Sequence, residues 1–332
     1  MSRLRLSVAI CTFNGAEYLP QQLESFAAQV RQPDEMVIFD DCSTDNTVQL
    51  IKYFSKNVTF PVELHINDQN LGSTKNFEKA IGSCKGDIIV LSDQDDVWHP
   101  CKLELLEEVF KKFPNAGMVF SDAAVVDKDL NELGYRLWDA SGFGAKQQRL
   151  MGRGQYLQVL LRRTTVTGAT MAFRSTFRDL ILPIPFNFVH DEWISLLLGA
   201  VSELRFVPQP LILYRQHGNN QIGGSKKGFG CQLEEASHYR SAAYREYFDK
   251  YALVKERLLS AGKLGAKTLP IELIEQKMKH LRKRASLPPN RLLSVYLILW
   301  EALTLGYTRY SNGWKSVAKD LFYSQRSVDK HS

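Results

Sequence analysis

The chain has 332 residues, of which 44% are hydrophobic and 23% are charged, and it contains no low-complexity tract and no repeat of solenoid period. This composition excludes fibrous and repeat proteins and predicts one large globular domain with an appended region. Five scattered cysteines without a C-x-x-C pair argue against a disulfide framework or a structural zinc site, which favours a reducing compartment. The N-terminus lacks the long apolar run of a secretory signal, so we expect a cytoplasmic protein.

Positive charge is concentrated in the C-terminal third of the chain. Residues 221–332 contain 20 Lys and Arg against 10 Asp and Glu, whereas residues 1–220 contain 22 against 26. This basic region predicts contact with an anionic partner, either the headgroups of a membrane or a phosphate-bearing substrate. A solvated helical face would have the same composition.

Apolar runs and amphipathic stretches alternate along the first hundred residues. We expect strands at 6–11, 35–40, 62–67 and 87–92, and helices at about 17–29, 44–55, 75–83 and 102–112. Continuously apolar strands separated by helices predict a parallel sheet with helices on both faces.

Polar clusters follow the ends of these four strands, with the sequences CTFNGAE, DDCSTDNT, NDQNLGSTKN and DQDDVW. Open α/β sheets bind ligands outside the carboxyl ends of their strands, so the four clusters are expected to line one crevice. An exposed turn is the alternative for any single cluster. For DDCSTDNT taken alone, an exposed turn that caps the next helix is the better interpretation.

The second part of the chain is less regular. We expect a strand at 118–127, an irregular segment at 133–154, a helix at 156–163, a turn opening a helix within 186–200, and a strand at 204–217. From about residue 226 the pattern is helical, basic and rich in leucine. The sequence therefore predicts a catalytic domain at 1–225, with a donor half at 1–125 and an acceptor half at 126–225, followed by a helical region at 226–332.

The apolar stretch 292–307 is too short to cross a membrane and contains Glu301. Buried amphipathic packing is the favoured interpretation. A helix lying in the membrane interface, flanked by the basic segment LRKR, is the alternative.

The segment DQDD places Asp93, Asp95 and Asp96 directly after an apolar strand. Neighbouring carboxylates repel one another, and a hard divalent cation among them removes that repulsion. The pattern predicts bound Mg²⁺ or Mn²⁺ with substrate phosphates. A charged exposed loop is the alternative.

The order of the motifs resembles that of the family 2 glycosyltransferases, which are inverting enzymes with the GT-A fold. The resemblance covers about residues 6–222 and rests on CTFNGAEYL, FDDCSTDNT, NLGSTKNFEKAIGSCKGDIIVLSDQDDVW, TGATMAFR, HDEW and YRQHGNN. The SDQDD, HD and YRQH forms look most like bacterial rhamnosyltransferase-type enzymes of surface polysaccharide synthesis. The resemblance implies an α/β fold with a mainly parallel sheet and C-terminal helices.

The resemblance also implies which residues bind a nucleotide-sugar donor. At the ends of the first two strands, the base of the donor, uracil or thymine, and the adjoining part of the donor would be bound by Thr12, Phe13, Asn14, Glu17 and Asp41. Asp93 would contact ribose or sugar. Lys75 stands where the family often has an arginine, and Arg215 would neutralise the charge of the leaving group. Asp95 and Asp96 would hold the metal, completed by His217; a purely structural histidine is the alternative for His217.

The acceptor side follows from the same resemblance. Asp191 of HDEW would be the catalytic base at the start of a helix, with Glu192 as the competing candidate and a simple helix cap as the alternative role. Gly168 and Ala169 would let the acceptor approach, and tight backbone packing would explain Gly168 equally well. Trp193 could stack on a sugar face, although packing in the core or at its rim is the favoured interpretation.

The expected reaction is transfer from a UDP- or dTDP-sugar, dTDP-rhamnose included, to a hydroxyl of a glycan or a polyprenyl-diphosphate-linked glycan. The protein would lie in the cytoplasm or on the inner face of the membrane, with no nucleic-acid partner. One rival is a sugar nucleotidyltransferase, which would usually carry a basic, glycine-rich loop after its first strand. The other rival is a noncatalytic nucleotide-sugar-binding scaffold at the membrane.

Overall fold

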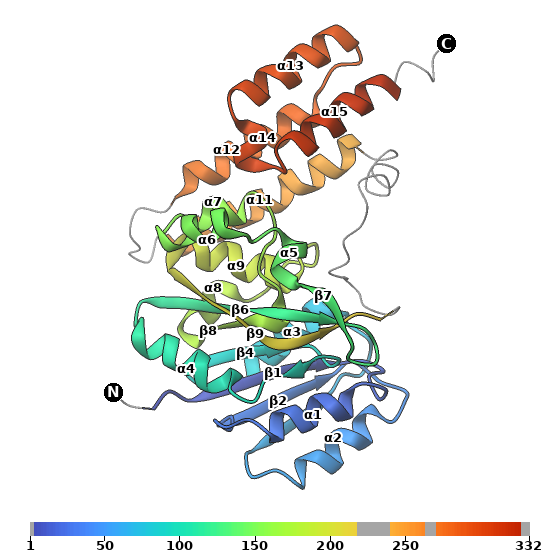
Figure 1. The fold of residues 1–332 in the computed structure, drawn as a ribbon, viewed down its shortest axis with the longest axis vertical. Coiled ribbons are helices and arrows are strands. Elements are labelled where there is room, and N and C mark those ends of the chain that lie inside the picture. Colours follow the sequence, from blue (N-terminus) through green and yellow to red (C-terminus); the bar gives the residue numbers. More distant parts are fainter. Residues whose placement is uncertain (1–2, 218–239, 263–269, 327–332) are drawn as a thin grey trace. The chain divides into compact units, whose positions relative to one another are not determined.

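The computed structural model describes residues 3–217, 240–262 and 270–326 (Figure 1). Two compact units divide the chain. The first contains residues 1–154 and 165–225, and the second contains residues 155–164 and 226–332. The segment 155–164, assigned by the sequence to the acceptor half, thus groups with the C-terminal unit. The boundary predicted at residue 226 and the final GNN of YRQHGNN lie outside the described residues.

The first unit opens with four parallel strands. They are β1 (Leu6–Thr12), β2 (Glu35–Asp40), β3 (Val62–Ile66) and β4 (Ile88–Ser92), and the helices between them are α1 (Leu19–Ala27), α2 (Thr47–Ser55) and α3 (Ser73–Ser83). The strands β2 and β4 are completely buried and β1 is buried except at the half-buried Cys11, as their continuous apolar runs predict. One core cluster joins alternate residues of β1 to α1 and α4 (Lys102–Lys112). Helix α3 covers the opposite face (Figure 1).

The described residues form a sheet of nine strands in the order β3-β2-β1-β4-β8-β6-β9-β5, with β7 paired to β6. The added strands are β5 (Val97–Trp98), β6 (Ala116–Val126), β7 (Glu132–Arg136), β8 (Met171–Arg174) and β9 (Glu203–Arg215). Strand β8 is antiparallel to both β4 and β6, whereas β6 and β9 are parallel. The expectation of an α/β fold with C-terminal helices is confirmed, and the parallel pairs of the first half continue into a mixed second half.

The segment 133–154, expected to be irregular, is largely regular. It holds most of β7 and the helices α5 (Leu137–Ser141) and α6 (Ala145–Gly152). The rings of Trp138 and Phe143 pack on Phe120 of β6 and Phe206 of β9. These tertiary aromatic contacts decide the local structure, and the glycine-rich sequence alone does not show them.

Short helices lead from this segment to the last strand. They are α7 (Tyr156–Leu160), the 3₁₀ turns η1 (Gly168–Thr170) and η2 (Ser175–Phe177), α8 (Arg178–Ile181) and α9 (His190–Val201). Helix α9 contacts α3 and β9. The start of α9 therefore lies on the face of the sheet that α3 covers, where His190 stacks on Phe77.

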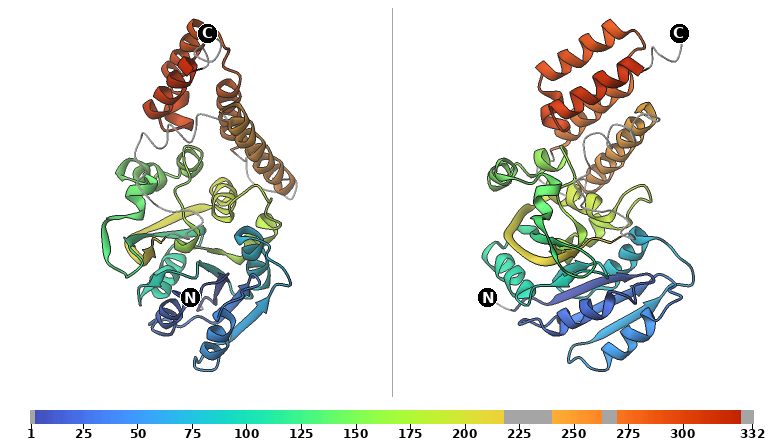
Figure 2. Two further views of the ribbon diagram at one scale, coloured as in Figure 1. Left: turned by 90° about the vertical axis from the view of Figure 1, so that its right-hand side faces the viewer. Right: turned by 45° about the vertical axis from the view of Figure 1, so that its right-hand side comes forward.

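The second unit is helical, with α7 joined by α11 (Arg240–Gly262), α12 (Ile271–Ala285), α13 (Arg291–Leu303), α14 (Gly306–Tyr310) and α15 (Trp314–Arg326) (Figure 2). The expectation that 292–307 packs with its apolar side buried is wrong. Helix α13 buries Ser294, Ile298 and Glu301 and leaves all of its leucines exposed. None of the described helices combines the length and the apolarity that a membrane span needs.

Candidate functional site

The acidic turn after β4 is tied to the loop after β1. The Phe13 amide donates to Gln94 Oε1 at 2.8 Å, and Gln94 Nε2 donates to the Phe13 carbonyl at 3.0 Å. A Cβ at Gly15 would lie 2.2 Å from Gln94 Oε1, so only glycine leaves room for this amide. The first and fourth polar clusters therefore meet, as their strand-end positions predict.

Asp93 lies in this turn, partly buried, and the pKa of its carboxyl is raised to about 7. Burial is the main cause, and the charges of Asp95 and Asp191 add to it, while the Lys102 ammonium opposes them. The charge of Asp191, about a hundred residues further along the chain, thus acts on the DQDD turn. The structure brings together the predicted donor-binding aspartate and the predicted base.

Asp95 is next to His217, whose Nε2 atom lies 2.9 Å from Asp95 Oδ2. Both side chains are partly accessible to solvent. The imidazole also packs against the Tyr18 ring, with the ring centroids 4.6 Å apart. A carboxylate oxygen and an imidazole nitrogen on one accessible edge match the ligand chemistry of Mn²⁺ and related divalent cations.

Asp96, the third predicted ligand, points into the protein. It is completely buried, and its Oδ1 atom accepts a hydrogen bond from the Arg215 amide at 3.1 Å. Among the described residues, no group of three His, Cys, Asp or Glu side chains is arranged to hold a metal ion. Asp95 and His217, which lie side by side, would hold a cation whose remaining ligands come from a substrate. Such a two-residue site matches the way diphosphates share their metal ions with proteins.

Arg215 supports the DQDD turn through hydrogen bonds of its buried side chain. It is almost completely buried, and its guanidinium donates to the Asp95 carbonyl at 2.7 Å, to the Lys128 carbonyl and to Gln21 Oε1 at 2.6 Å. The central carbon of the guanidinium also lies 4.7 Å from the centroid of the Tyr18 ring. This geometry favours a positioning role for Arg215 over the predicted contact with a leaving group.

The loops after β1 and β2 use most of their polar groups internally. Thr12 is buried and donates to Asp40 Oδ2 at 2.7 Å. The Asp41 carboxylate accepts bonds from the amides of Leu71 and Gly72, both at 2.8 Å, and from the Asn67 side chain at 2.9 Å. Asp41 thus holds the loop before α3.

The remaining predicted donor residues of these loops are more accessible. Phe13, Asn14 and Glu17 are exposed. The Asn14 side chain accepts a bond from the Thr44 amide at 2.8 Å, and its φ of 46° places it in the left-handed region. The exposed Phe13 ring lies at the carboxyl end of β1, where the sequence places a nucleobase.

Lys75 is directed toward the segment before α9. Its ammonium donates to Glu78 Oε2 at 2.8 Å and to the Ile184 carbonyl at 2.6 Å, and it lies 4.4 Å above the Phe186 ring. These contacts link α3 to residues 184–188. The geometry favours this linking role over the predicted donor contact.

Asp191 stands in the first turn of α9 and is held by two backbone amides. Gly168 N donates to its Oδ2 atom at 3.1 Å, and Glu192 N donates to its Oδ1 atom at 2.6 Å. Burial nevertheless raises the pKa of this carboxyl to about 6. A carboxylate with this pKa is ionised at neutral pH and is more basic than an ordinary aspartate, as a general base requires.

The neighbours of Asp191 on α9 differ in their placement. Glu192 is partly exposed, and its backbone amide is the group that supports Asp191. Trp193, predicted to stack on a sugar, is instead buried, and its indole donates to the Ile181 carbonyl at 2.8 Å. Helix α9 is buried along most of its length, and its fourth residue, Trp193, faces inward.

Gly168 and Ala169 contact the site through their backbones. A Cβ at Gly168 would lie 2.4 Å from His190 Nε2, so the close approach of η1 to α9 requires glycine. The Ala169 carbonyl accepts a bond from the ammonium of Lys102 at 2.8 Å. The two small residues therefore join the acceptor segment to the base and to the acidic turn.

Sequence reasoning missed Lys102 and His190. Lys102 is completely buried, lies 3.6 Å above the Trp98 ring and faces the charges of Asp93 and Asp96. His190 is buried against the Phe77 ring, and neither ring nitrogen has a hydrogen-bond partner among the described residues. A lysine at the start of an amphipathic helix is normally exposed, so no local signal marks Lys102.

Comparison with known proteins places this geometry in context. A sequence profile described as Glycosyl transferase family 2 matches residues 7–181, which is more than half of the chain. A dTDP-rhamnosyl transferase of Shigella flexneri, RfbG, is 24% identical over 264 residues, covering 73% of this chain and 83% of that protein. An uncharacterized protein of Mycobacterium tuberculosis is 25% identical over 270 residues, covering 79% of this chain and 73% of that protein.

Two solved structures show a similar fold. The TarS fragment 1–349 of S. aureus, in complex with UDP-GlcNAc, has a TM-score of 0.55 at 14% identity, covering 98% of this chain and 92% of that chain. The mannosyltransferase PcManGT of Pyrobaculum calidifontis, in complex with GDP-Man and Mn²⁺, has a TM-score of 0.52 at 16% identity, covering 100% and 89%.

Proposed function

Since the chain belongs to glycosyltransferase family 2 and transfers a sugar from a nucleotide-sugar donor, we propose that it does so with inversion of the anomeric centre. The observation that carries this mechanism is the pair of carboxylates at Asp93 and Asp191. They come from opposite halves of the catalytic unit and are close enough for the charge of one to raise the pKa of the other. A single displacement needs a base opposite the leaving group; Asp191, on the acceptor side, is proposed for that role, while Asp93 is proposed to bind the donor.

Asp191 is the base in this mechanism. Its carboxylate takes the proton of an acceptor hydroxyl, whose oxygen forms a bond to the anomeric carbon. The bond between that carbon and the diphosphate breaks, and its electron pair leaves with the phosphate oxygen. The amides of Gly168 and Glu192 hold the carboxylate in place, and burial keeps it basic enough to accept the proton.

The donor is proposed to lie across the ends of β1, β2 and β4. The exposed Phe13 ring and the Asp41 loop would take the base, and Asp93 would bind ribose or sugar. Asp95 and His217 would hold a divalent cation with the diphosphate, while Asp96 and Arg215 position them. A bound cation would stabilise the negative charge of the departing diphosphate.

The donor is proposed to be a UDP- or dTDP-sugar, and dTDP-rhamnose is the first candidate. The likeness to the dTDP-rhamnosyl transferase of S. flexneri over most of both chains supports it. The acceptor is proposed to be a hydroxyl of a glycan or of a lipid-linked glycan.

The four described cysteines, Cys11, Cys42, Cys84 and Cys101, are free thiols, which supports a reducing, cytoplasmic compartment for this reaction.

Incubation of the purified chain with a panel of nucleotide sugars, with and without Mn²⁺, tests the proposal. Release of a nucleoside diphosphate that requires Mn²⁺ and is abolished in Asp191→Asn is the expected result. Formation of pyrophosphate from a sugar phosphate and a nucleoside triphosphate would replace the proposal by a nucleotidyltransferase. Donor binding without turnover, with candidate acceptors supplied, would indicate a noncatalytic scaffold.

A further inference from the structure

Helix α13 is amphipathic in the opposite sense to an ordinary surface helix. Its buried positions include the polar residues Ser294 and Glu301. Its exposed positions are large and apolar, with Leu292 at 83% and Leu303 at 78% relative exposure, and they include Leu293, Tyr296, Leu297, Leu299 and Trp300. Positions 292, 296, 299 and 303 follow the i, i+4, i+7, i+11 spacing of one helical stripe. We call the exposed apolar residues of α13 the α13 face.

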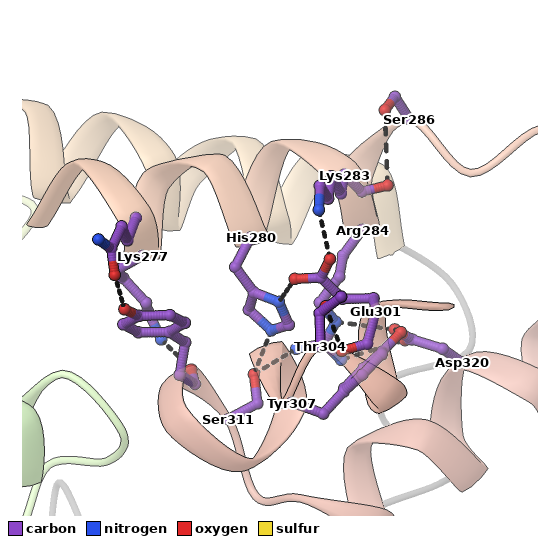
Figure 3. A network of polar contacts seen from close by, with 12 residues as sticks. Lys277, His280, Lys283, Arg284, Ser286, Glu301, Thr304, Tyr307, Ser311 and Asp320 are labelled. Carbon is purple, nitrogen blue, oxygen red and sulfur yellow. Dashed lines mark hydrogen bonds and ion pairs between the residues drawn. The ribbon is translucent and has the colours of Figure 1, made fainter. Parts of the chain in front are cut away.

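A buried polar network fixes the orientation of this helix (Figure 3). His280 Nδ1 lies 2.8 Å from Glu301 Oε1, and the Lys283 ammonium binds the other carboxylate oxygen. The second ring nitrogen of His280 contacts Ser311 Oγ at 2.9 Å. Turning α13 over would leave Glu301 without these partners and would bury the leucines in their place.

The network extends to a second buried carboxylate. Arg284 donates to Ser311 Oγ at 2.8 Å and to Asp320 Oδ2 at 2.7 Å, and the Tyr307 hydroxyl donates to the same Asp320 atom at 2.6 Å (Figure 3). Helices α12, α13, α14 and α15 are thereby joined through side chains whose burial demands full hydrogen bonding.

The turn after α13 is shaped around Glu301. A Cβ at Gly306 would lie 2.1 Å from Glu301 Oε1, so only glycine leaves space for the carboxylate. Leu305, in the same turn, has a φ of 63° and is itself exposed. The outward display of the α13 face is therefore maintained by several independent features of the fold.

The charge around the α13 face has one sign. Between residues 287 and 319 the single acidic residue of the sequence is Glu301, which is buried. The exposed cations Arg291, Arg309 and Lys315 lie along the same stretch, and Trp314, next to Lys315, is 70% exposed. Exposed leucines, tryptophans and a tyrosine, in a stretch of sequence whose exposed charges are all cations, match a surface with an apolar interior and anionic headgroups.

We propose that the α13 face docks onto an anionic phospholipid bilayer, with Trp300, Trp314 and the leucines in the interfacial layer. A second copy of the chain is the weaker occupant, because two such surfaces would bring cations together without carboxylates between them. With 13 residues, α13 is too short to cross a bilayer, so it would lie in the plane of the interface. This proposal does not depend on the transfer reaction.

Co-sedimentation of the full chain with vesicles tests the proposal. Vesicles of phosphatidylcholine alone are compared with vesicles that also contain phosphatidylglycerol, at low and high salt. The variant Leu292→Gln/Leu303→Gln removes two exposed leucines from the α13 face, and the matched control Val30→Gln/Tyr53→Gln removes two exposed apolar side chains from the catalytic unit. We expect binding to the anionic vesicles, weakened by salt, with about a tenfold loss in the first variant only.

Tryptophan fluorescence provides a second measurement. Trp98, Trp138 and Trp193 are buried, so a blue shift on addition of anionic vesicles reports on Trp300 and Trp314. Arg309→Gln/Lys315→Gln should reduce the shift by weakening the electrostatic attraction. This second variant leaves the leucines unchanged, so it tests the proposal even if the leucine variant misfolds.

Three results would overturn the proposal. They are absence of binding to both vesicle types, equal binding by the leucine variant and its control, and a dimer in solution that the leucine variant dissociates. The last result would assign the α13 face to a second copy of the chain.

Discussion

Asp191 Oδ2 accepts a hydrogen bond from the Gly168 amide at 3.1 Å, which fixes the start of α9 to the turn before β8. The two residues are 23 positions apart in the chain, and the bond orients the carboxylate that we propose as the base. In the proposed mechanism, the placement of the base depends on this contact.

Replacement of Asp191 by Asn should abolish transfer while leaving donor binding nearly unchanged. The amide keeps the shape of the side chain but cannot take a proton, and general bases typically contribute about 10²- to 10⁴-fold to the rate. Turnover and the Kd of the donor are measured on the same preparation. Glu192→Gln is the matched control, with an expected loss of a few-fold at most, and normal turnover in Asp191→Asn would remove this residue from the mechanism.

The turnover rate should rise with pH through an apparent pKa of about 6. Burial raises the pKa of the Asp191 carboxyl to this value from its ordinary 3.8. The base acts in its ionised form, so protonation below pH 6 should reduce kcat about tenfold per pH unit. The measurement is kcat at saturating donor and acceptor between pH 4.5 and pH 8, and a rate independent of pH in this interval contradicts the assignment.

Gly168→Ala should reduce both activity and stability. The added methyl group would lie 2.4 Å from His190 Nε2 and would push η1 away from Asp191. Overpacking of this kind typically costs about 1–3 kcal/mol of stability. The control Gly152→Ala adds a methyl group with nothing within 4 Å.

The double variant Gly168→Ala/His190→Ala supplies a second check of the same contact. Removal of the imidazole makes room for the methyl group, so part of the lost activity should return. If the double variant is no more active than Gly168→Ala, the clash with His190 is not the cause.

His217→Ala should increase the Mn²⁺ concentration needed for half-maximal activity. The imidazole nitrogen lies 2.9 Å from Asp95 Oδ2, and removal of groups that hold or orient a metal typically costs about 10- to 100-fold in affinity. A Mn²⁺ titration of nucleoside diphosphate release measures the effect. His65→Ala, at a partly exposed histidine of β3, is the control, and equal Mn²⁺ dependence in both variants would contradict a metal-binding role for His217.

Asp320→Asn should destabilise the C-terminal helices. The substitution leaves the buried guanidinium of Arg284 without its ionic partner, which typically costs about 3–5 kcal/mol. Hydrogen exchange of the backbone amides in α12–α15 measures the loss for this unit separately. Lys255→Met removes the cation of a more exposed ion pair with Glu275. It should change the free energy of opening measured by hydrogen exchange by less than about 1 kcal/mol.

Local sequence patterns were sufficient for much of the catalytic unit. The strand Glu35–Asp40 and the helix Lys102–Lys112 have the predicted bounds, because a continuous apolar run and a 3.6-residue period are properties of short segments. The meeting of the DQDD turn with the β1 loop also followed, because parallel strands end at one edge of a sheet.

The direction of individual side chains could not be predicted in this way. Asp95 and Asp96 are neighbours in the sequence, yet one faces His217 at the accessible edge and the other is buried beside the Arg215 backbone. Trp193 is in the core, and Lys102 is buried among acidic groups. These placements depend on segments that are distant in the chain.

The sequence by itself determined the alternation of strands and helices, the position of the acidic turn and the amphipathic character of residues 291–303. Only the tertiary structure decided which side of that helix is covered. Periodicity shows which residues share a face of the helix, but it does not show which face packs against another helix. The partners of Glu301, namely His280 and Lys283, come from another helix. Their contacts turn the polar side of α13 inward and leave its leucines exposed.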